Sequence, residues 1–309
     1  MGLSRSIADF AAEIGDGSDP VHVFGSGSRL GTDVGTRCVE PPSGIVEFQP
    51  DEMTVRCGAR TPIAELLATV ATSGQFVNLP DSADARGTVG GALAVGRTGP
   101  RRLGHGPVRD SLLQTVHVDH RGRVIRAGGP TVKNVSGFDL ARLHVGTYGV
   151  FGFLAEVILR TRPTPIESRW LTAEVDDPTV ASRLVTDLHR PTAVLWDGNR
   201  VWVCLEGHPL DIDESAAGLS RAGITFSTSA EPDLSGHSHR WSTPAADAVD
   251  VAMRQPGHRV VELGVGIVHD RAPTPVRAVE PPNAIVIRRL LDEFNPGRRL
   301  NPSFVDLVQ

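Results

Sequence analysis

The stretch TVKNVSGFDLARLHVGTYGVFGF, residues 131–153, combines four glycines with a high apolar content. It is too apolar for a solvated loop, and its glycines make it a poor helix or strand. Gly146, Gly149 and Gly152 recur every three residues, and Tyr148 among them is the only tyrosine of the chain. Regularly spaced small residues also occur in packed membrane helices, but no apolar span of about 20 residues surrounds these. The pattern predicts a backbone that wraps closely around a ligand.

A second glycine cluster lies near the N-terminus. GSGSRLG, residues 25–31, follows the strand-like VHVF, as a dinucleotide fingerprint would, and Glu47 lies 20 residues beyond Gly27. Residues 30–43 show no helical period, however, which disfavours a Rossmann site. We interpret the cluster as a loop whose backbone N–H groups and serine hydroxyls bind an anion, with a plain glycine turn as the alternative.

A third cluster lies in RGTVGGALAVGRTGPRRLGHGPVRD, residues 86–110. Gly90 and Gly91 follow Thr88, and adjacent glycines let a backbone approach a planar or phosphorylated ligand. The arginines of this segment could contact a phosphate or a partner. For Arg101 and Arg102 we favour a solvated surface position instead.

Composition limits the classes of protein to which the chain can belong. Its 309 residues and 32.9 kDa suffice for two lobes, each with a core. A net charge of −5 and a pI of about 6.1 give no electrostatic reason to expect nucleic acid or an anionic membrane as partner. The first 20 residues lack a long apolar run, so we expect neither a signal peptide nor a membrane-spanning segment there.

Cysteine and histidine usage argues against metal centres. Cys38, Cys57 and Cys204 are widely spaced and form no CxxC, which disfavours a disulfide framework, an iron–sulfur cluster or a zinc site. His237 and His239 form a close pair in a polar segment, but no acidic partner stands at a recognisable spacing. We therefore expect no metal, and a reduced cytosol is the simplest location.

Periodicity predicts mixed helices and strands. Residues 61–74 predict an amphipathic helix with Thr61 as N-cap and Gly74 as its end. PTP at 163–165 is a plausible domain boundary, beyond which strands and helices alternate; residues 227–245 are expected to be a polar loop. The remaining predicted segments are helices at 7–14, 177–189, 213–223 and within the C-terminal tail, and strands at 21–24, 44–48, 54–57, 112–119, 153–162, 170–176, 193–198 and 200–207.

Taken together, the glycine clusters resemble a known family. The chain is similar to FAD-binding proteins of the p-cresol methylhydroxylase type, in the vanillyl-alcohol oxidase superfamily, and most similar to the FAD-binding subunits of bacterial glycolate oxidases. The run VKNVSGFDL, followed by a GxxGxxG segment and an acid, is the most specific part. The other matching segments are GSGSRLG (25–31), TVGG (88–91), TGPRR (98–102), GPVRD (106–110) and NPGRRLNP (295–302).

The resemblance implies an α+β fold in which FAD lies extended between two α+β subdomains, with a small α+β cap domain. It implies an FAD domain over residues 1–163, a cap over 164–289 and a C-terminal segment, 290–309, that returns to the FAD domain. A β-carbon at Gly90 or Gly149 would then collide with the ligand. The cofactor-binding residues that it implies are Gly25, Ser26, Gly27, Ser28, Arg29, Pro80, Thr88, Gly90, Gly91, Arg109, Asp110, Gly137, Gly146, Thr147, Gly149, Phe153 and Asn301.

Two departures from the family pattern refine the expected function. Ser28 stands where members with covalent FAD often carry histidine, so we expect noncovalent FAD. The cap is small and lacks the histidine-rich motif of self-sufficient 2-hydroxyacid oxidising relatives, which favours a subunit of a glycolate-type complex. The resemblance then implies a larger FAD subunit and an iron–sulfur subunit as partners, a small 2-hydroxy acid as substrate, and a cytoplasmic protein that reaches the inner face of the cell membrane only through its partners.

Two alternatives remain open. The chain could be a stand-alone FAD-dependent oxidoreductase of the same fold that acts on another small alcohol or an enol. Such an enzyme needs a proton donor or base, for which Tyr148 or a cap histidine could serve, although a packing role accounts for Tyr148 equally well. The chain could also be a non-catalytic assembly subunit that has lost FAD, which the intact glycines disfavour. The catalytic residues are otherwise unknown from the sequence.

Overall fold

A computed structural model gives the arrangement of most of the chain. The residues that it describes are 2–27, 36–80, 87–130, 139–221, 224–237, 239–254, 258–272 and 283–307.

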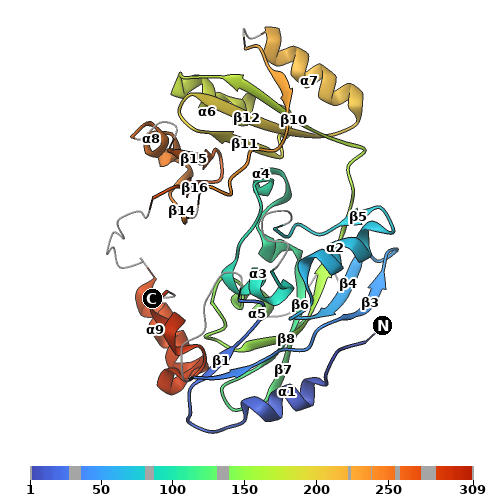
Figure 1. Cartoon of the computed structure of the whole chain (residues 1–309), viewed down its shortest axis with the longest axis vertical. Coiled ribbons are helices and arrows are strands. Elements are labelled where there is room, and N and C mark those ends of the chain that lie inside the picture. Colours follow the sequence, from blue (N-terminus) through green and yellow to red (C-terminus); the bar gives the residue numbers. More distant parts are fainter. Residues whose placement is uncertain are drawn as a thin grey trace. The chain divides into compact units, whose positions relative to one another are not determined.

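The chain forms two compact units. The first comprises Met1–Gly99, Pro107–Thr164 and Ala278–Gln309, and the second comprises Pro100–Gly106 and Pro165–Arg277. Each unit combines helices with antiparallel strands (Figure 1), which confirms the predicted α+β class.

The first unit is built on a five-stranded antiparallel sheet in the order β3-β4-β8-β6-β7. It also contains a short parallel pair, β1-β2, and an antiparallel pair, β5-β9. The helices and strands of this unit are α1 (Ile7–Ile14), β1 (Val21–Val23), β2 (Arg37–Val39), β3 (Ile45–Gln49), β4 (Thr54–Gly58), α2 (Ile63–Ala71), β5 (Gln75–Phe76), α3 (Val89–Val95), η1 (Val108–Ser111), β6 (Leu112–Val118), β7 (Val124–Gly128), α5 (Leu140–Leu143), β8 (Phe153–Arg160), β9 (Arg162–Pro163), α9 (Ala284–Phe294), η3 (Pro296–Arg298) and η4 (Pro302–Leu307).

Two hydrophobic clusters hold this unit together. In one, α2 and α3 pack their apolar side chains on β3, β4 and β8. In the other, Phe10 and Ile14 of α1 pack with residues of β1, β2 and the adjoining ends of β6 and β8. Strand β8, with the sequence FLAEVILR, is buried along nearly its whole length, Glu156 included, as suits a central strand.

The C-terminal segment is fastened to the start of the chain. Leu300 forms a parallel bridge with Val21, which extends the β1-β2 pair. The buried Arg299 donates hydrogen bonds to the carbonyls of Ile14 and Gly15, at 2.9 and 3.0 Å. A cation at the C-terminal end of α1 also suits the helix dipole. These contacts bring the last residues of the chain back to its first strand.

The start of α2 differs from the prediction. The N-cap is Pro62, and no side chain caps this helix. The Thr61 hydroxyl instead accepts a hydrogen bond from the Gly44 N–H at 2.9 Å, so it joins two loops rather than opening the helix. Gly74, with φ of +64°, follows the last turn and returns its N–H to Ala71, as predicted for the residue that ends the helix.

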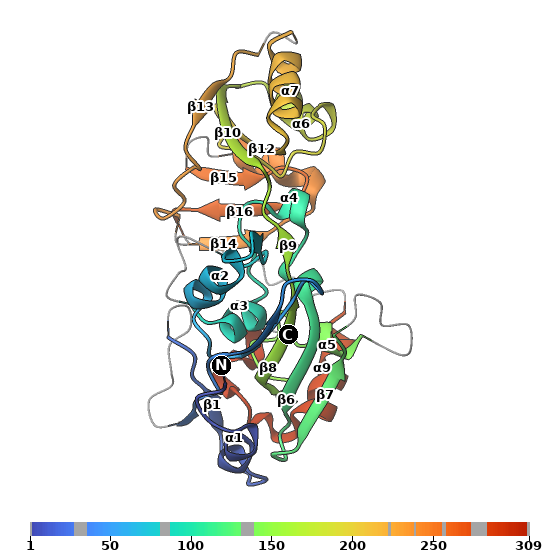
Figure 2. The ribbon, with the colours of Figure 1, turned by 90° about the vertical axis from the view of Figure 1, so that its right-hand side faces the viewer.

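The second unit is a seven-stranded antiparallel sheet in the order β13-β10-β12-β11-β15-β16-β14 (Figure 2). Its elements are α4 (Arg102–His105), β10 (Glu167–Glu174), α6 (Pro178–Asp187), β11 (Ala193–Trp196), β12 (Arg200–Gly207), α7 (Pro209–Arg221), β13 (Ser227–Ser229), β14 (His239–Ser242), η2 (Ala245–Asp247), α8 (Ala248–Met253), β15 (Arg259–Glu262) and β16 (Ile267–Asp270). The segment 227–245, predicted as a polar loop, contributes both edge strands, β13 and β14. Its polar sequence suits edge strands: β13 is mostly exposed and β14 is partly buried.

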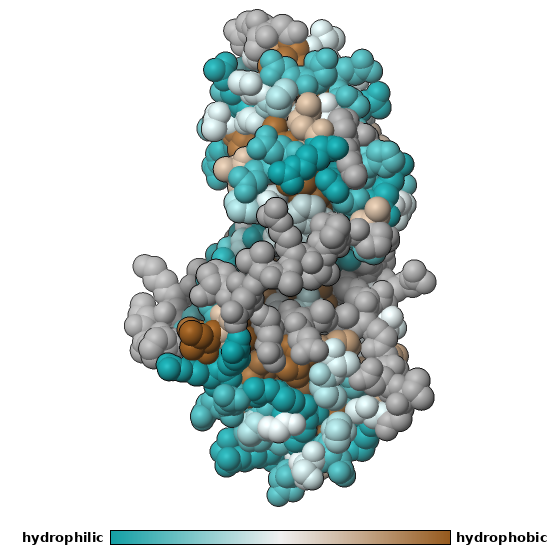
Figure 3. All heavy atoms as spheres, turned by 90° about the vertical axis from the view of Figure 1, so that its left-hand side faces the viewer, coloured by the Kyte–Doolittle hydropathy of each residue, from teal (hydrophilic) through white to brown (hydrophobic). Residues whose placement is uncertain are grey.

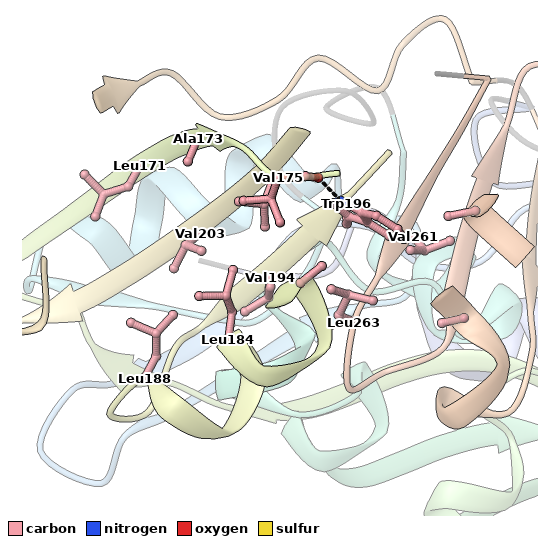
Figure 4. Close-up of a cluster of buried hydrophobic side chains, with 14 of the residues drawn as sticks. Leu171, Ala173, Val175, Leu184, Leu188, Val194, Trp196, Val203, Val261 and Leu263 are labelled. Carbon is pink, nitrogen blue, oxygen red and sulfur yellow. Dashed lines mark hydrogen bonds between the residues drawn. The ribbon is translucent and has the colours of Figure 1, made fainter. Parts of the chain in front are cut away.

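Helices α6, α7 and α8 pack on one face of this sheet. Alternate residues of β10, β11 and β12 point into that core, where Trp196 is fully buried (Figure 4). The Trp196 indole N–H donates to the Val175 carbonyl at 2.7 Å, so burial of the ring leaves no polar atom unpaired.

The surface of the first unit carries apolar side chains near α9. Figure 3 shows the face on which α9 lies, where apolar atoms reach the surface among polar ones. Ile285 and Val286, at the start of α9, are 68% and 55% exposed.

Candidate cofactor site

One cavity of the first unit brings the three glycine clusters together. Its open volume is about 840 Å³, which includes the part open to solvent. The predicted site residues that line it are Gly25, Ser26, Gly27, Thr88, Gly90, Gly91, Tyr148, Gly149, Phe153 and Asn301. Segments that lie far apart in the sequence therefore form a single wall.

The first glycine loop leaves the sheet directly after β1. The Phe24 N–H donates to the Val39 carbonyl at 2.8 Å, and Gly27 then adopts a φ of +66°, which favours glycine. The Gly25 carbonyl accepts a hydrogen bond from Nε of Arg60 at 3.1 Å. Arg60 also pairs with Glu40 at 2.9 Å. A guanidinium thus stands beside the loop that was predicted to bind an anion.

The second cluster begins helix α3 at the cavity. The Thr88 hydroxyl accepts a hydrogen bond from the Gly91 N–H at 3.2 Å and so caps the helix. The Gly90 N–H donates to the Ala59 carbonyl at 2.7 Å, and a Cβ at Gly90 would lie 2.8 Å from the Ala59 Cβ. Glycine at position 90 is therefore required by packing within the protein, whereas the sequence reasoning gave collision with the ligand as the cause.

The third cluster forms a tight turn between α5 and β8. Gly146, Gly149 and Gly152 have φ values of +79°, +75° and +145°, which side chains disfavour. Tyr148 also has a left-handed φ of +53°, unusual for a bulky residue. Its N–H donates to the Ala94 carbonyl at 2.8 Å, which fixes this strained backbone on α3. Such strain is typical of functional sites.

Asn301 connects this turn to β1. Its Oδ1 accepts a hydrogen bond from the Val23 N–H at 2.9 Å, and its Nδ2 donates to the Tyr148 carbonyl at 2.6 Å. The side chain is 1% exposed, and its own φ is +45°, which asparagine tolerates better than most residues. Asn301 therefore holds two cavity walls at a fixed separation.

Two stacked histidines lie behind the glycine turn. His144 lines the cavity, and its ring stacks on His117 of β6 with centroids 3.9 Å apart. The Nδ1 atoms of both rings are buried and have no hydrogen-bond partner among the described residues. Burial lowers the pKa of His144 to about 3 and that of His117 to about 4. Both rings are therefore neutral at physiological pH.

Five predicted site residues lie outside the cavity wall. Arg109 and Asp110 belong to η1, where Arg109 is exposed and Asp110 pairs with Arg142 at 3.5 Å. Thr147 is buried and donates its hydroxyl to the His144 carbonyl at 3.1 Å. The other two are Pro80, which is buried, and Gly146, whose N–H donates to Leu93. Ser28, Arg29 and Gly137 lie outside the described residues.

Sequence reasoning missed half of the cavity wall. The additional lining residues are Val23, Phe24, Pro41, Ala59, Arg60, Ala94, Val95, His144, Gly152, Leu154 and Phe304. Gly152 belongs to the glycine pattern but was not predicted as a site residue. The others carry no local signal, since an arginine after a strand or a histidine in an apolar segment is common in any fold.

The lining fits a large ligand with an aromatic part and an anionic part. Aromatic and aliphatic side chains form much of the wall, with the glycines of the three clusters and one arginine beside them. No described lining residue is a carboxylate. Nδ1 of His144 has no partner among the described residues, so this ring adds unused hydrogen-bonding capacity to the wall.

The second unit has its own polar cluster. Arg101 pairs with Glu206 at 3.1 Å and with Glu231 at 3.0 Å, and its guanidinium lies over the Trp170 ring. Burial would raise the pKa of Glu206, but His105 at 2.8 Å and Arg101 hold it below its usual value. The expectation that Arg101 is simply solvated is therefore wrong: it is an ion-paired residue of this unit.

Neither a metal centre nor a membrane span is found among the described residues. They contain no group of three or more histidine, cysteine or acidic side chains placed to hold an ion. Of the helices in the described ranges, none is long and apolar enough to cross a bilayer.

Comparisons with known proteins agree with this geometry. Residues 5–128 match the FAD binding domain family. Glycolate oxidase subunit GlcE of Escherichia coli strain K12 is 32% identical over 199 residues, 61% of this chain and 56% of that protein. Glycolate oxidase subunit GlcD of Bacillus subtilis strain 168 is 29% identical over 144 residues, 47% of this chain and 31% of that protein. The solved structure of alkyldihydroxyacetonephosphate synthase matches 96% of this chain and 73% of that one, with a TM-score of 0.66 and 12% identity.

These likenesses differ in what they establish. The structural match, at 12% identity, confirms the fold alone. The sequence matches establish an FAD-binding domain, and FAD is its cofactor. The chain spans only 56% and 31% of the two glycolate oxidase subunits.

Proposed function

We propose that this chain, whose residues 5–128 match the FAD binding domain family, is the flavin-carrying subunit of a glycolate-type 2-hydroxyacid oxidoreductase and holds FAD noncovalently. The observation that carries the proposal is the convergence of all three glycine clusters on one cavity. The similarity to two glycolate oxidase subunits supports the choice of substrate class.

The residues of the cavity suggest a division of roles toward FAD. We assign the anionic pyrophosphate to the loop at residues 25–27, where backbone amides and the Arg60 guanidinium are close together. We assign the flavin and ribityl groups to the wall formed by Gly90, Gly91 and the turn at residues 146–152. When bound, FAD supplies the redox chemistry by accepting electrons from the substrate, and the protein supplies binding and orientation.

The noncovalent mode rests on the side chains available to the flavin. A covalent link of the family's kind needs a histidine or cysteine. Among the described lining residues there is no cysteine, and His144 is the single histidine. Its ring is 2% exposed and stacked on His117, which is a poor arrangement for attachment. Ser28, which motivated this proposal, lies outside the described residues.

We further propose that a larger FAD subunit and an iron–sulfur subunit are the partners. The names of the two relatives, which are subunits of glycolate oxidases, support an assembly. Exposed Ile285 and Val286 at the start of α9 would give a partner an apolar contact. The location, cytoplasmic and at the membrane only through partners, follows from the same proposal.

The first test is the visible spectrum of the purified chain, followed by acid precipitation. Flavin bands near roughly 370 and 450 nm, with yellow released to the supernatant, are expected for noncovalent FAD. Yellow retained in the pellet would contradict the noncovalent mode. A colourless protein that takes up no added FAD would overturn the proposed function.

The second test concerns the reaction. Under anaerobic conditions glycolate or another small 2-hydroxy acid should bleach the flavin when the co-purified partners are present and not with the isolated chain. Bleaching by the isolated chain would instead establish a stand-alone oxidoreductase, and then the Tyr148 hydroxyl becomes the side chain to substitute first.

A further inference from the structure

We propose that His144 is a cofactor-positioning residue whose ring hydrogen-bonds bound FAD, with His117 behind it as a stacked support. This inference rests on the proposed function, because it requires FAD in the cavity. Neither histidine was identified from the sequence. Both are drawn from the geometry of the cavity wall and from the unmet hydrogen-bonding capacity of the rings.

The His144 ring is buried in the cavity wall. The ring is 2% exposed, and its Nδ1 has no partner among the described residues. Buried polar atoms in proteins are nearly always hydrogen-bonded, so His144, which lines the cavity, is a side chain with unused hydrogen-bonding capacity. His117 also has an unpaired Nδ1 but does not line the cavity, so the position of His144 in the cavity wall is what marks it for contact with a ligand.

The absence of a side chain at position 152 leaves the His144 ring next to the cavity. Gly152 lines the cavity beside His144. A Cβ at Gly152 would lie 3.1 Å from Cδ2 of His117 and 3.3 Å from Cε1 of His144. Any larger residue at position 152 would therefore press on the stacked pair and cover it. The glycine, at a φ of +145°, keeps the ring next to open space.

The His144 ring is held in place and is electrically neutral. His117 on β6 stacks against it at 3.9 Å, and the hydroxyl of Thr147 donates to the His144 backbone carbonyl. Burial lowers the pKa of both rings and keeps them unprotonated; Asp119 opposes this effect at His117 and not at His144. A neutral imidazole offers one donor and one acceptor, so it can orient a polar group of FAD without adding charge.

The experiment compares His144→Phe with the matched variant His117→Phe in the full chain. Both remove a buried unpaired nitrogen from the same stack, but only His144 lines the cavity. Apoprotein is titrated with FAD, and binding is followed by flavin fluorescence. We expect His144→Phe to weaken FAD binding about two- to twelve-fold, the worth of one hydrogen bond, and His117→Phe to change it less than two-fold. His144→Asn, which keeps a donor and an acceptor, should recover part of the loss.

A spectroscopic measurement on the wild-type chain tests the same contact without a variant that could fail to fold. In the wild-type chain labelled with ¹⁵N at histidine, FAD addition should shift the ring nitrogens of His144 in a direction typical of a new hydrogen bond. Unchanged His144 ring signals on FAD saturation, or equal affinity losses for the two phenylalanine variants, would overturn the inference. Failure of the wild-type chain to bind FAD at all would be a different result, because it overturns the proposed function itself.

Discussion

Replacing Asn301 with alanine should loosen the cofactor cavity more than it destabilises the fold. The side chain joins the end of β1 to the strained turn at Tyr148 through two hydrogen bonds, at 2.9 and 2.6 Å. Without it, the Val23 N–H and the Tyr148 carbonyl lose their partners. Each unpaired, partly buried group costs about 1–2 kcal/mol, and alanine at a φ of +45° adds about 1 kcal/mol. The free energy of unfolding should fall by about 3–5 kcal/mol.

A matched control lies six residues earlier. Asn295 is fully buried, and its amide makes two hydrogen bonds with the backbone of Leu300, both at 3.0 Å. Asn295→Ala therefore removes the same number of buried hydrogen bonds from the same segment, about 2–4 kcal/mol, but Asn295 does not line the cavity. Asn295→Ala removes hydrogen bonds from Leu300, the residue directly before Asn301, so the two substitutions disturb the same part of the backbone.

Two spectroscopic signals distinguish the unfolding of the two units. All four tryptophans lie in the second unit, so tryptophan fluorescence reports the unfolding of that unit, whereas circular dichroism reports both. In urea, Asn301→Ala and Asn295→Ala should shift the dichroism transition and leave the fluorescence transition in place. FAD affinity should fall at least ten-fold, about 1.4 kcal/mol, in Asn301→Ala and less than two-fold in Asn295→Ala. Equal affinities in the two variants would refute the argument that Asn301 sets the width of the cavity.

Two further predictions concern the glycine and histidine positions. Gly90→Val should lower the melting temperature of the apoprotein, because its Cβ would lie within 3 Å of the backbone and Cβ of Ala59. The control Gly99→Ala, whose Cβ has nothing within 4 Å, should leave the melting temperature unchanged. An unaltered melting temperature for Gly90→Val would show that the ligand alone requires the glycine. The pKa values of His117 and His144 are depressed in the folded chain, so the unfolded state binds more protons than the folded state between pH 6.5 and about 4. The free energy of unfolding therefore falls as the pH falls through this window, by at most about 1.4 kcal/mol per pH unit for each histidine. In the variant with phenylalanine at both positions, 117 and 144, the free energy of unfolding, measured by denaturation at pH 7 and pH 5, should fall less with pH than in the wild-type chain. An equal fall in the two proteins would contradict the burial of neutral histidine rings.

Much of the fold was predictable because its signals are local. The helix at 7–14 has the bounds expected from its apolar spacing, and strands β3, β4, β6 and β8 lie within a residue or two of their predicted ranges. These elements depend on side-chain periodicity along a short segment. Two errors, the cap of α2 and the loop at 227–245, arose where a non-local partner decided the outcome. Gly44 engages Thr61, and the neighbouring strands β10 and β16 pair with polar segments that have weak strand signals of their own.

The sequence by itself determined that three glycine-rich backbones must approach something closely, since glycine lacks the side chain that would hold a neighbouring group away from the backbone. It also determined, through its resemblance to a family, that the ligand is FAD. Only the tertiary structure decided which backbones meet, that Gly90 is needed for its contact with Ala59, and that Arg60 and His144 stand at the cavity. The physical reason is that the absence of a side chain is visible in the sequence as glycine. Hydrogen-bond partners and burial, by contrast, depend on residues that only folding brings together.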